Sequence, residues 1–80
     1  MLEDLCTDKK VIGIKQSQKA VEEGTALKAY VASDCDDKVK LPFLALCRSK
    51  GIQVVSADSM EQLGTACGIN VGAAVAVILN

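Results

Sequence analysis

Hydrophobic and polar positions along the 80-residue chain fall into short blocks, and many of these blocks end at a glycine or a polar cluster. Runs of apolar and β-branched side chains predict four strands, at residues 11–14, 27–32, 52–55 and 74–79. Helical spacing of apolar positions predicts four helices, at residues 2–7, 16–23, 41–50 and from Ser59 to Ala66 or Cys67. Residues 33–38 are predicted to form a loop, because they are rich in serine and aspartate.

Individual residues set the predicted helix ends. Ser59 is a favourable N-cap, and Gln62 stands three residues later as in a capping box. Pro42 is expected in the first turn of its helix, where proline is tolerated. The buried face of that helix is predicted at Leu41, Leu44 and residues 45–47. Three glycines are expected to end the helices, namely Gly24, Gly51 and Gly68.

The alternation of helices and strands predicts an α/β fold, with one sheet between helical layers. The connections are short, so residues 1–80 are expected to form a single-domain three-layer α-β-α sandwich. Residues 74–79 are apolar throughout, which is typical of a strand covered on both faces. The pattern alone leaves open which strands are parallel.

Charge and composition exclude several functional classes. Nine basic and ten acidic residues give a net charge of −1, unlike the strongly cationic profile of a general nucleic-acid binder. Any basic patch must therefore arise by folding. No apolar run approaches the roughly 20 residues that a membrane span requires, and the acidic start lacks a signal pattern. We therefore expect a cytoplasmic protein with no membrane partner.

The four cysteines are far apart, and the chain has no histidine. Zinc sites of the finger type need paired local ligands, so no metal site is expected. Cys47 and Cys67 are expected in the core, whereas Cys35 lies in a polar stretch and is expected to be exposed. Without a histidine, a phosphate-binding glycine loop or a partnered carboxylate pair, the sequence predicts neither an enzyme nor a cofactor.

The first candidate site is the segment from Gly13 to Lys19. A glycine between a strand and a helix permits unusual dihedrals or close approach to a ligand. Helix N-termini carry partial positive charge, so Lys15 and Lys19 are unfavourable there unless an anion such as phosphate is present. Gln16 adds a donor and an acceptor that can read a base edge. The alternative is an ordinary solvated helix face, with Lys19 paired to Glu23.

The second candidate is the loop between Gly68 and Gly72. Ile69 and Val71 flank Asn70, and exposed apolar loop residues often mark a contact surface. The alternative is a helix cap followed by a turn. A third segment, residues 33–37, superficially resembles a calcium loop, but its spacing favours turn and capping roles for Asp34, Asp36 and Asp37.

Three stretches together carry a family resemblance: residues 13–19 (GIKQSQK), 30–37 (YVASDCDD) and 63–74 (LGTACGINVGAA). In order and spacing the chain resembles the small bacterial relatives of the kink-turn RNA-binding ribosomal proteins of the large subunit, the "seven-Ae" family. The resemblance covers essentially the whole chain. It implies a three-layer sandwich around a four-stranded mixed sheet.

The resemblance also implies a function and its residues. Gly13 would let the backbone approach RNA, Lys15 and Gln16 would contact the guanines of tandem sheared G·A pairs, and Lys19 would contact a guanine edge or a phosphate. The apolar loop would hold the protruding unpaired nucleotide through Ile69, Asn70 and Val71. The implied partner is structured RNA with a kink-turn, either ribosomal RNA or a messenger untranslated region, bound by a monomer.

The chain departs from the family pattern at several positions, and two acidic residues among them, with the weak net charge, keep a second hypothesis open. Archaeal and eukaryotic members usually have Asn-Glu where this chain has Lys15-Gln16, a difference shared by the bacterial branch. Family members often carry basic residues near the end of this helix, where this chain has Glu22 and Glu23. The alternative is a protein–protein interaction module of the same fold that has lost RNA binding.

Overall fold

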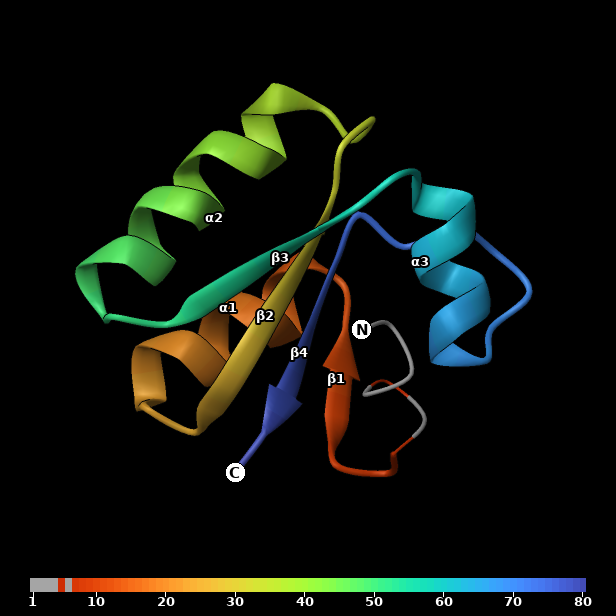
Figure 1. Cartoon of the computed structure of the whole chain (residues 1–80). Coiled ribbons are helices and arrows are strands. Elements are labelled where there is room, and N and C mark those ends of the chain that lie inside the picture. Colours follow the sequence, from red (N-terminus) through yellow and green to blue (C-terminus); the bar gives the residue numbers. More distant parts are fainter. Residues whose placement is uncertain (1–4, 6) are drawn as a thin grey trace.

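We describe the protein from a computed structural model, which describes Leu5 and residues 7–80. The described residues form three helices and four strands (Figure 1). In chain order these elements are β1 (Lys10–Ile12), α1 (Ile14–Glu23), β2 (Ala26–Ala32), α2 (Asp37–Ser49), β3 (Gln53–Ala57), α3 (Met60–Cys67) and β4 (Val75–Leu79). The helix predicted at residues 2–7 lies largely outside the described residues.

The four strands form one mixed sheet in the order β1-β4-β2-β3. Strand β4 is antiparallel to both of its neighbours, with Val77 opposite Val11 of β1 and Ala29 of β2. Strands β2 and β3 are parallel, with Tyr30 opposite Val55. The mixed four-stranded sheet is therefore the one that the family resemblance implied.

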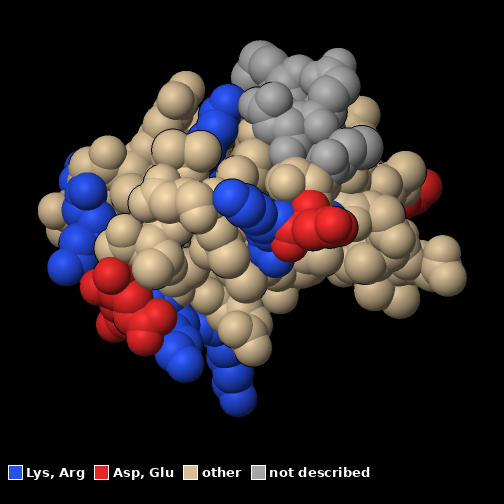
Figure 2. All heavy atoms as spheres, turned by 90° about the horizontal axis from the view of Figure 1, so that it is seen from below, with Lys and Arg blue, Asp and Glu red and all other residues tan. Residues whose placement is uncertain are grey.

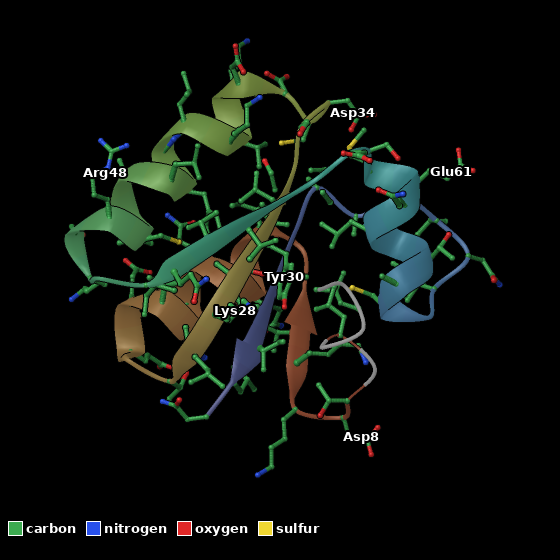
Figure 3. All side chains as sticks on the ribbon, viewed as in Figure 1. Asp8, Lys28, Tyr30, Asp34, Arg48 and Glu61 are labelled. Atoms are coloured by element: carbon green, nitrogen blue, oxygen red, sulfur yellow. The ribbon has the colours of Figure 1, made fainter. Side chains whose placement is uncertain are left out.

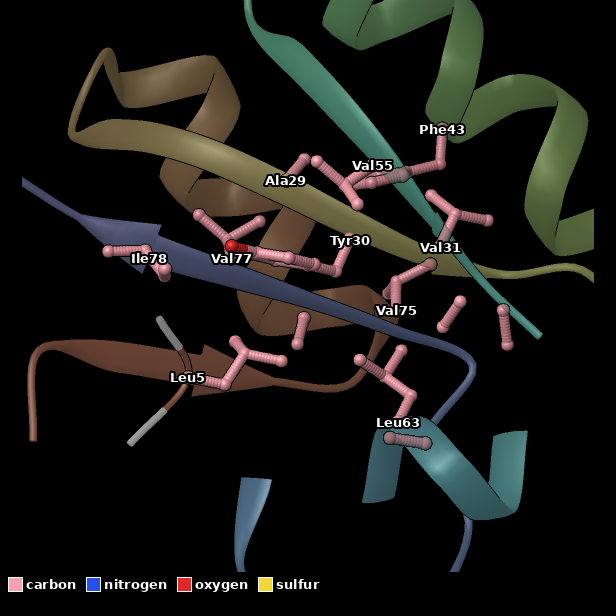
Figure 4. Packing of buried hydrophobic residues seen from close by; sticks show 14 of the residues in the cluster. Leu5, Ala29, Tyr30, Val31, Phe43, Val55, Leu63, Val75, Val77 and Ile78 are labelled. Carbon is pink, nitrogen blue, oxygen red and sulfur yellow. The ribbon is translucent and has the colours of Figure 1, made fainter. Parts of the chain in front are cut away.

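Helices cover both faces of this sheet, which confirms the predicted α-β-α sandwich. Helices α1 and α2 pack against each other on one face, and α3 covers the other (Figure 1). The central strand β4 is buried on both sides, as its uniformly apolar sequence predicted. Figure 4 shows how Tyr30, Phe43 and Leu63 fill the space between the sheet and the helices.

Helix α2 differs most from its prediction. It begins at Asp37 because the Asp36 side chain caps it, accepting a 2.9 Å hydrogen bond from the Lys38 amide. The helix therefore starts four residues before the predicted position, and Pro42 lies in its interior instead of its first turn. Pro42 has no N–H to donate to the Lys38 carbonyl, which an exposed position tolerates because water can bind that carbonyl.

The predicted buried face of α2 was also wrong in part. Phe43 and Cys47 are the buried residues of this helix, whereas Leu41 is 58% exposed and Ala45 is exposed. The positions that face the core recur at four-residue spacing, with Val39 partly buried one turn before Phe43. The aromatic ring of Phe43, one residue after the proline, fills the core position instead.

The cysteine predictions had mixed outcomes. Cys47 and Cys67 are buried, as expected, but Cys35 is only 6% exposed and not the surface thiol predicted from its polar neighbours. Burial raises the pKa of all three thiols above the usual value, in Cys35 against the opposing effect of Lys40. The loop around Cys35 thus turns an apolar side chain inward while its neighbouring acids face solvent.

The remaining predicted boundaries were accurate to within two residues. Strand β1 starts one residue and ends two residues earlier than the predicted range of 11–14, so that Ile14 begins α1 instead of ending the strand. Strand β3 runs to Ala57 instead of ending at Val55. Gly24 and Gly68 end α1 and α3 in the left-handed conformation, as predicted.

Candidate nucleic-acid interface

All three helices begin at the same end of the sheet (Figure 1), where four chain segments meet. Backbone hydrogen bonds tie these segments together: Gly13 N–H donates to Val75 O at 3.0 Å, Ala32 N–H to Ala74 O at 2.8 Å, and Ser33 N–H to Ala57 O at 2.8 Å. We call this region the loop end and define it as Gly13 with residues 33–36, 58–59 and 68–74.

Gly13 connects β1 to α1 in a conformation that favours glycine. Its φ of 97° and ψ of 157° lie outside the regions that L side chains readily adopt. A Cβ at Gly13 would meet nothing within 4 Å, so the requirement comes from the backbone and not from crowding. Glycine also brings no side-chain acceptor to the N-cap position, and among the described residues no side chain caps the first amides of α1.

The buried face of α1 determines where its polar residues lie. Ser17, Ala20 and Val21 face the core, and Lys15, Gln16 and Lys19 are consequently exposed on the outer side. Within Leu5 and residues 7–80, the side chains of these three residues form no hydrogen bond or ion pair.

In the described part of the chain, Lys19 does not form the alternative ion pair with Glu23. Gln16, Lys19 and Glu23 nevertheless line one shallow hollow, together with Val11 and Leu79 at the β1 side of the sheet. Gln16 and Lys19 are thus brought together, while Lys15 is not among the residues that line this hollow.

The second candidate segment divides into an anchor and an exposed part. Ile69 is partly buried against the core, and its N–H donates to Gly64 O at 3.1 Å. Asn70 is exposed, and Val71 is the most exposed large hydrophobic residue described, at 69%. Of the three predicted residues, only Asn70 and Val71 are therefore fully accessible to a ligand.

The position of this loop depends on two glycines and on Met60. A Cβ at Gly64 would overlap the carbonyl oxygen of Val71, and a Cβ at Gly72 would lie 3.2 Å from the Met60 Cβ. Ala73 N–H donates to Met60 O at 2.9 Å. Met60 itself is 37% exposed, so it adds apolar surface beside the loop. Met60 was not predicted from the sequence, although Gly64 and Gly72 could have indicated that the chain packs closely beside this loop.

The starts of α2 and α3 are satisfied by side chains of the loop end. Ser59 Oγ accepts from Gln62 N–H at 3.0 Å, which confirms the predicted N-cap. The Gln62 side chain accepts from Asp58 N–H at 3.3 Å, so the reciprocal half of the predicted capping box is displaced by one residue. The carboxylates of Asp34 and Asp36 accept hydrogen bonds from the amides of Met60 and Lys38, which confirms the capping interpretation for these two residues. Asp37 is instead the first residue of α2 and lies 3.5 Å from the Lys40 ammonium.

Comparison with known proteins identifies the family. The sequence profile of the ribosomal protein L7Ae/L30e/S12e/Gadd45 family matches residues 3–80. The chain belongs to this family. The L7Ae resemblance carried by the stretches at 13–19, 30–37 and 63–74 is thereby confirmed.

Relatives of this L7Ae-family protein include bacterial and archaeal proteins. An RNA-binding protein of Caldanaerobacter subterraneus subsp. tengcongensis is 42% identical over 71 residues, covering 89% of this chain and 87% of the relative. The RNA-binding protein YbxF of Geobacillus stearothermophilus is 42% identical over 69 residues, covering 86% and 84%. The large ribosomal subunit protein eL8 of Halobacterium salinarum is 34% identical over 84% of this chain and 57% of the relative.

A solved structure shares the L7Ae-family fold. The Giardia lamblia 15.5kD RNA binding protein superposes with a TM-score of 0.88 at 27% identity, covering 99% of this chain and 68% of that one. The arrangement of helices and strands around the loop end is therefore common to proteins with little overall sequence identity.

One end of this L7Ae-family member carries both basic and acidic side chains. Figure 2 shows the end of the molecule opposite the loop end, where basic and acidic side chains lie beside one another. In the described part of the chain, no three histidine, cysteine, aspartate or glutamate side chains are grouped so as to hold a metal ion. None of the described helices has the length and apolar character needed to cross a membrane.

Proposed function

We propose that this protein binds RNA at its loop end and recognises the kink-turn, a bent duplex with tandem sheared G·A pairs and a protruding nucleotide. RNA binding is supported by membership of the L7Ae family and by relatives that are named RNA-binding proteins. A-form RNA hides its major groove from side chains, so recognition of a bent, opened element is the physically accessible route.

The start of α1 supplies the polar half of this interface. Its uncapped first amides point along the helix axis out of the loop end and can bind a phosphate together with the ammonium groups of Lys15 and Lys19. Lysine donors also match the O6 and N7 acceptors of guanine, and the Gln16 carboxamide can donate and accept at a base edge. These side chains are exposed and make no competing contact among the described residues.

The loop at 68–74 supplies the apolar half. The isopropyl group of Val71 and the side chain of Met60 offer surface against which an unstacked base can pack, and Asn70 can hydrogen-bond to that nucleotide or its backbone. Ile69 contributes mainly by anchoring the loop to the core.

One observation carries the proposal: Gly13, at the start of α1, is hydrogen-bonded to Val75, where the apolar loop ends. This bond holds the start of α1 beside the end of the apolar loop, at one end of the sheet. A bent RNA can then contact both halves, whereas a straight duplex would reach them less well. Binding would favour the kinked form by population shift, without any covalent step.

We further propose that the protein acts as a monomer in the cytoplasm on ribosomal RNA or on a messenger untranslated region. An electrophoretic mobility-shift titration with a kink-turn duplex, and with a control in which the G·A pairs are replaced by Watson–Crick pairs, tests the proposal. We expect tighter binding to the kink-turn. Equal affinity for the two duplexes would reject shape-specific recognition.

The role of Lys19 can be tested in the same titration. Lys19→Ala should weaken binding and lower the salt dependence by about one phosphate contact, a slope change of about 0.9. Lys50→Ala is the matched control, because Lys50 is an exposed lysine at the α2–β3 connection, at the opposite end of the sheet. Equal losses in the two variants would point to general attraction by positive charge.

The exposed Val71 also suits a second candidate, a protein-interaction module that has lost RNA binding. Glu22 and Glu23 near the end of α1 and the net charge of −1 favour it, since they reduce attraction to phosphate. Size-exclusion chromatography of protein stripped of nucleic acid distinguishes the two. Stable self-association that Val71→Ser abolishes, together with no preference for kink-turn RNA, would support the module instead.

A further inference from the structure

We propose that Asp34 is a positioning residue for the loop at 68–74. Its carboxylate holds the first amide of α3, and α3 in turn fixes the height and orientation at which Asn70 and Val71 are presented. The consequence for RNA rests on the proposed function, whereas the consequence for the loop itself does not.

The contact that carries this inference joins two distant parts of the sequence. Asp34 Oδ1 accepts a 2.7 Å hydrogen bond from Met60 N–H, across 26 residues. Figure 3 shows Asp34 on the β2–α2 connection, close to the start of α3. The distance is typical of a charge-assisted hydrogen bond, and a carboxylate at a helix N-terminus also complements the helix dipole.

Asp34 is itself held in place. Ser33 N–H donates to Ala57 O at 2.8 Å, and the Lys40 ammonium donates to Ser33 O at 3.0 Å. The inward-facing Cys35 side chain anchors the next residue in the core. The carboxylate is therefore presented from a fixed loop, and it can act as an anchor for α3.

Met60 passes this restraint to the apolar loop. Its N–H binds Asp34, its carbonyl accepts from Ala73 N–H at 2.9 Å, and its Cβ lies against Gly72. The carbonyl of Val71 packs closely against Gly64, which lies one turn after Met60 in α3. A shift of the first turn of α3 would therefore move Gly72 and Ala73, and with them Val71.

The sign of the expected effect separates this role from that of an ordinary surface acid. A carboxylate on a face that meets phosphates repels them, so removing an uninvolved acid should strengthen RNA binding or leave it unchanged. Removing Asp34 should weaken binding. Asp58 is the matched control, because it is an exposed aspartate at the same loop end and uses its backbone N–H, not its carboxylate, in its hydrogen bond with Gln62.

Amide hydrogen exchange, measured by NMR on the free protein, tests the positioning role without RNA. In Asp34→Ala, we expect exchange at Met60 and Ala73 to accelerate by about tenfold, with exchange at Val77 in the central strand unchanged. Asp34→Asn keeps an acceptor oxygen and should stay within about threefold of the wild type. Asp58→Ala should leave both amides unchanged. An unaltered Ala73 exchange rate in Asp34→Ala would overturn the proposal.

Binding to RNA provides the second test, with a kink-turn duplex and the same duplex made abasic at the protruding nucleotide. Asp34→Ala should weaken binding to the intact duplex by about tenfold and have little effect on the abasic one, because only the intact duplex engages the loop. Equal weakening on both would indicate a general loss of structure and contradict the positioning role. If the wild type failed to prefer the kink-turn at all, the proposed function would fail, while the exchange result would still decide the role of Asp34.

Discussion

Helices α1 and α3 begin at the same end of the sheet, and their first turns are built from opposite types of residue. Helix α3 starts at the N-cap Ser59, carries Glu61 in its first turn, and receives the Asp34 carboxylate at its first amide. Helix α1 starts at Gly13, which offers no capping side chain, and carries Lys15 where α3 has an acid.

The difference shows which helix start serves the fold and which is available for a ligand. At α3, side chains of the protein satisfy the orphan amides and the positive end of the helix dipole. At α1, the amides and the nearby lysines are open to an external anion. Because both helix starts lie at the same end of the sheet, the α3 start can hold the apolar loop in place while the α1 start stays available to an anion such as the proposed RNA phosphate.

The largest effect on stability is expected from Gly64→Ala, at the contact between α3 and the loop at 68–74. The new methyl group would overlap the Val71 carbonyl, so either the loop or α3 must move. We expect the free energy of unfolding to fall by about 3 kcal/mol, measured by urea denaturation. Gly72→Ala is the control, since its Cβ would lie 3.2 Å from a side-chain atom, and it should cost about 1 kcal/mol. A smaller loss for Gly64→Ala than for Gly72→Ala would contradict the tight packing of Val71 on α3.

A somewhat smaller loss of stability is expected from Gly13→Ala, at the N-cap of α1. The methyl group has space, but a φ of 97° is unfavourable for alanine. We expect the free energy of unfolding to decrease by about 2 kcal/mol from backbone strain, again by urea denaturation. Stability equal to the wild type would mean that the strand-to-helix connection can adopt a negative φ without affecting the fold.

Removing the N-cap of α3 should have a moderate effect. Ser59→Ala leaves the Gln62 amide without its acceptor and should cost about 1 kcal/mol of unfolding free energy. Ser59→Asp retains an acceptor and should recover most of that stability. If the two variants were equally destabilised, the hydrogen bond to Gln62 would not be the source of the effect.

The features that were predictable from sequence depend on local chemistry. The helix ends at Gly24 and Gly68 and the N-cap at Ser59 follow from backbone preferences of single residues, and all three were confirmed. The predicted start of α2 was wrong because two local preferences competed. Capping by Asp36 outweighed the preference of Pro42 for a first turn.

The missed features depend on contacts between distant residues. Three such features form only in the folded chain: the Asp34–Met60 hydrogen bond, the contact of the Val71 carbonyl with Gly64, and the burial of Cys35. The candidate residues on α1 were found because lysines at a helix start conflict with the dipole, a conflict visible in the sequence itself. Their contacts with RNA stay a prediction.

The smallest change in stability is expected from Lys15→Glu, which gives α1 the acidic first turn that α2 and α3 already have. A carboxylate there complements the helix dipole, so the free energy of unfolding should rise by about 0.5 kcal/mol. The same change should weaken kink-turn binding by about tenfold, because a cation facing the RNA becomes an anion. Thermal denaturation and a mobility-shift titration of one preparation measure both effects.

Glu61→Lys in α3 is the mirror control and should lower stability by a similar amount. Opposite signs for stability and RNA affinity in Lys15→Glu would mean that Lys15 is unfavourable for the free fold and useful only when an anion is bound. If stability and affinity fell together, Lys15 would be an ordinary structural residue of α1.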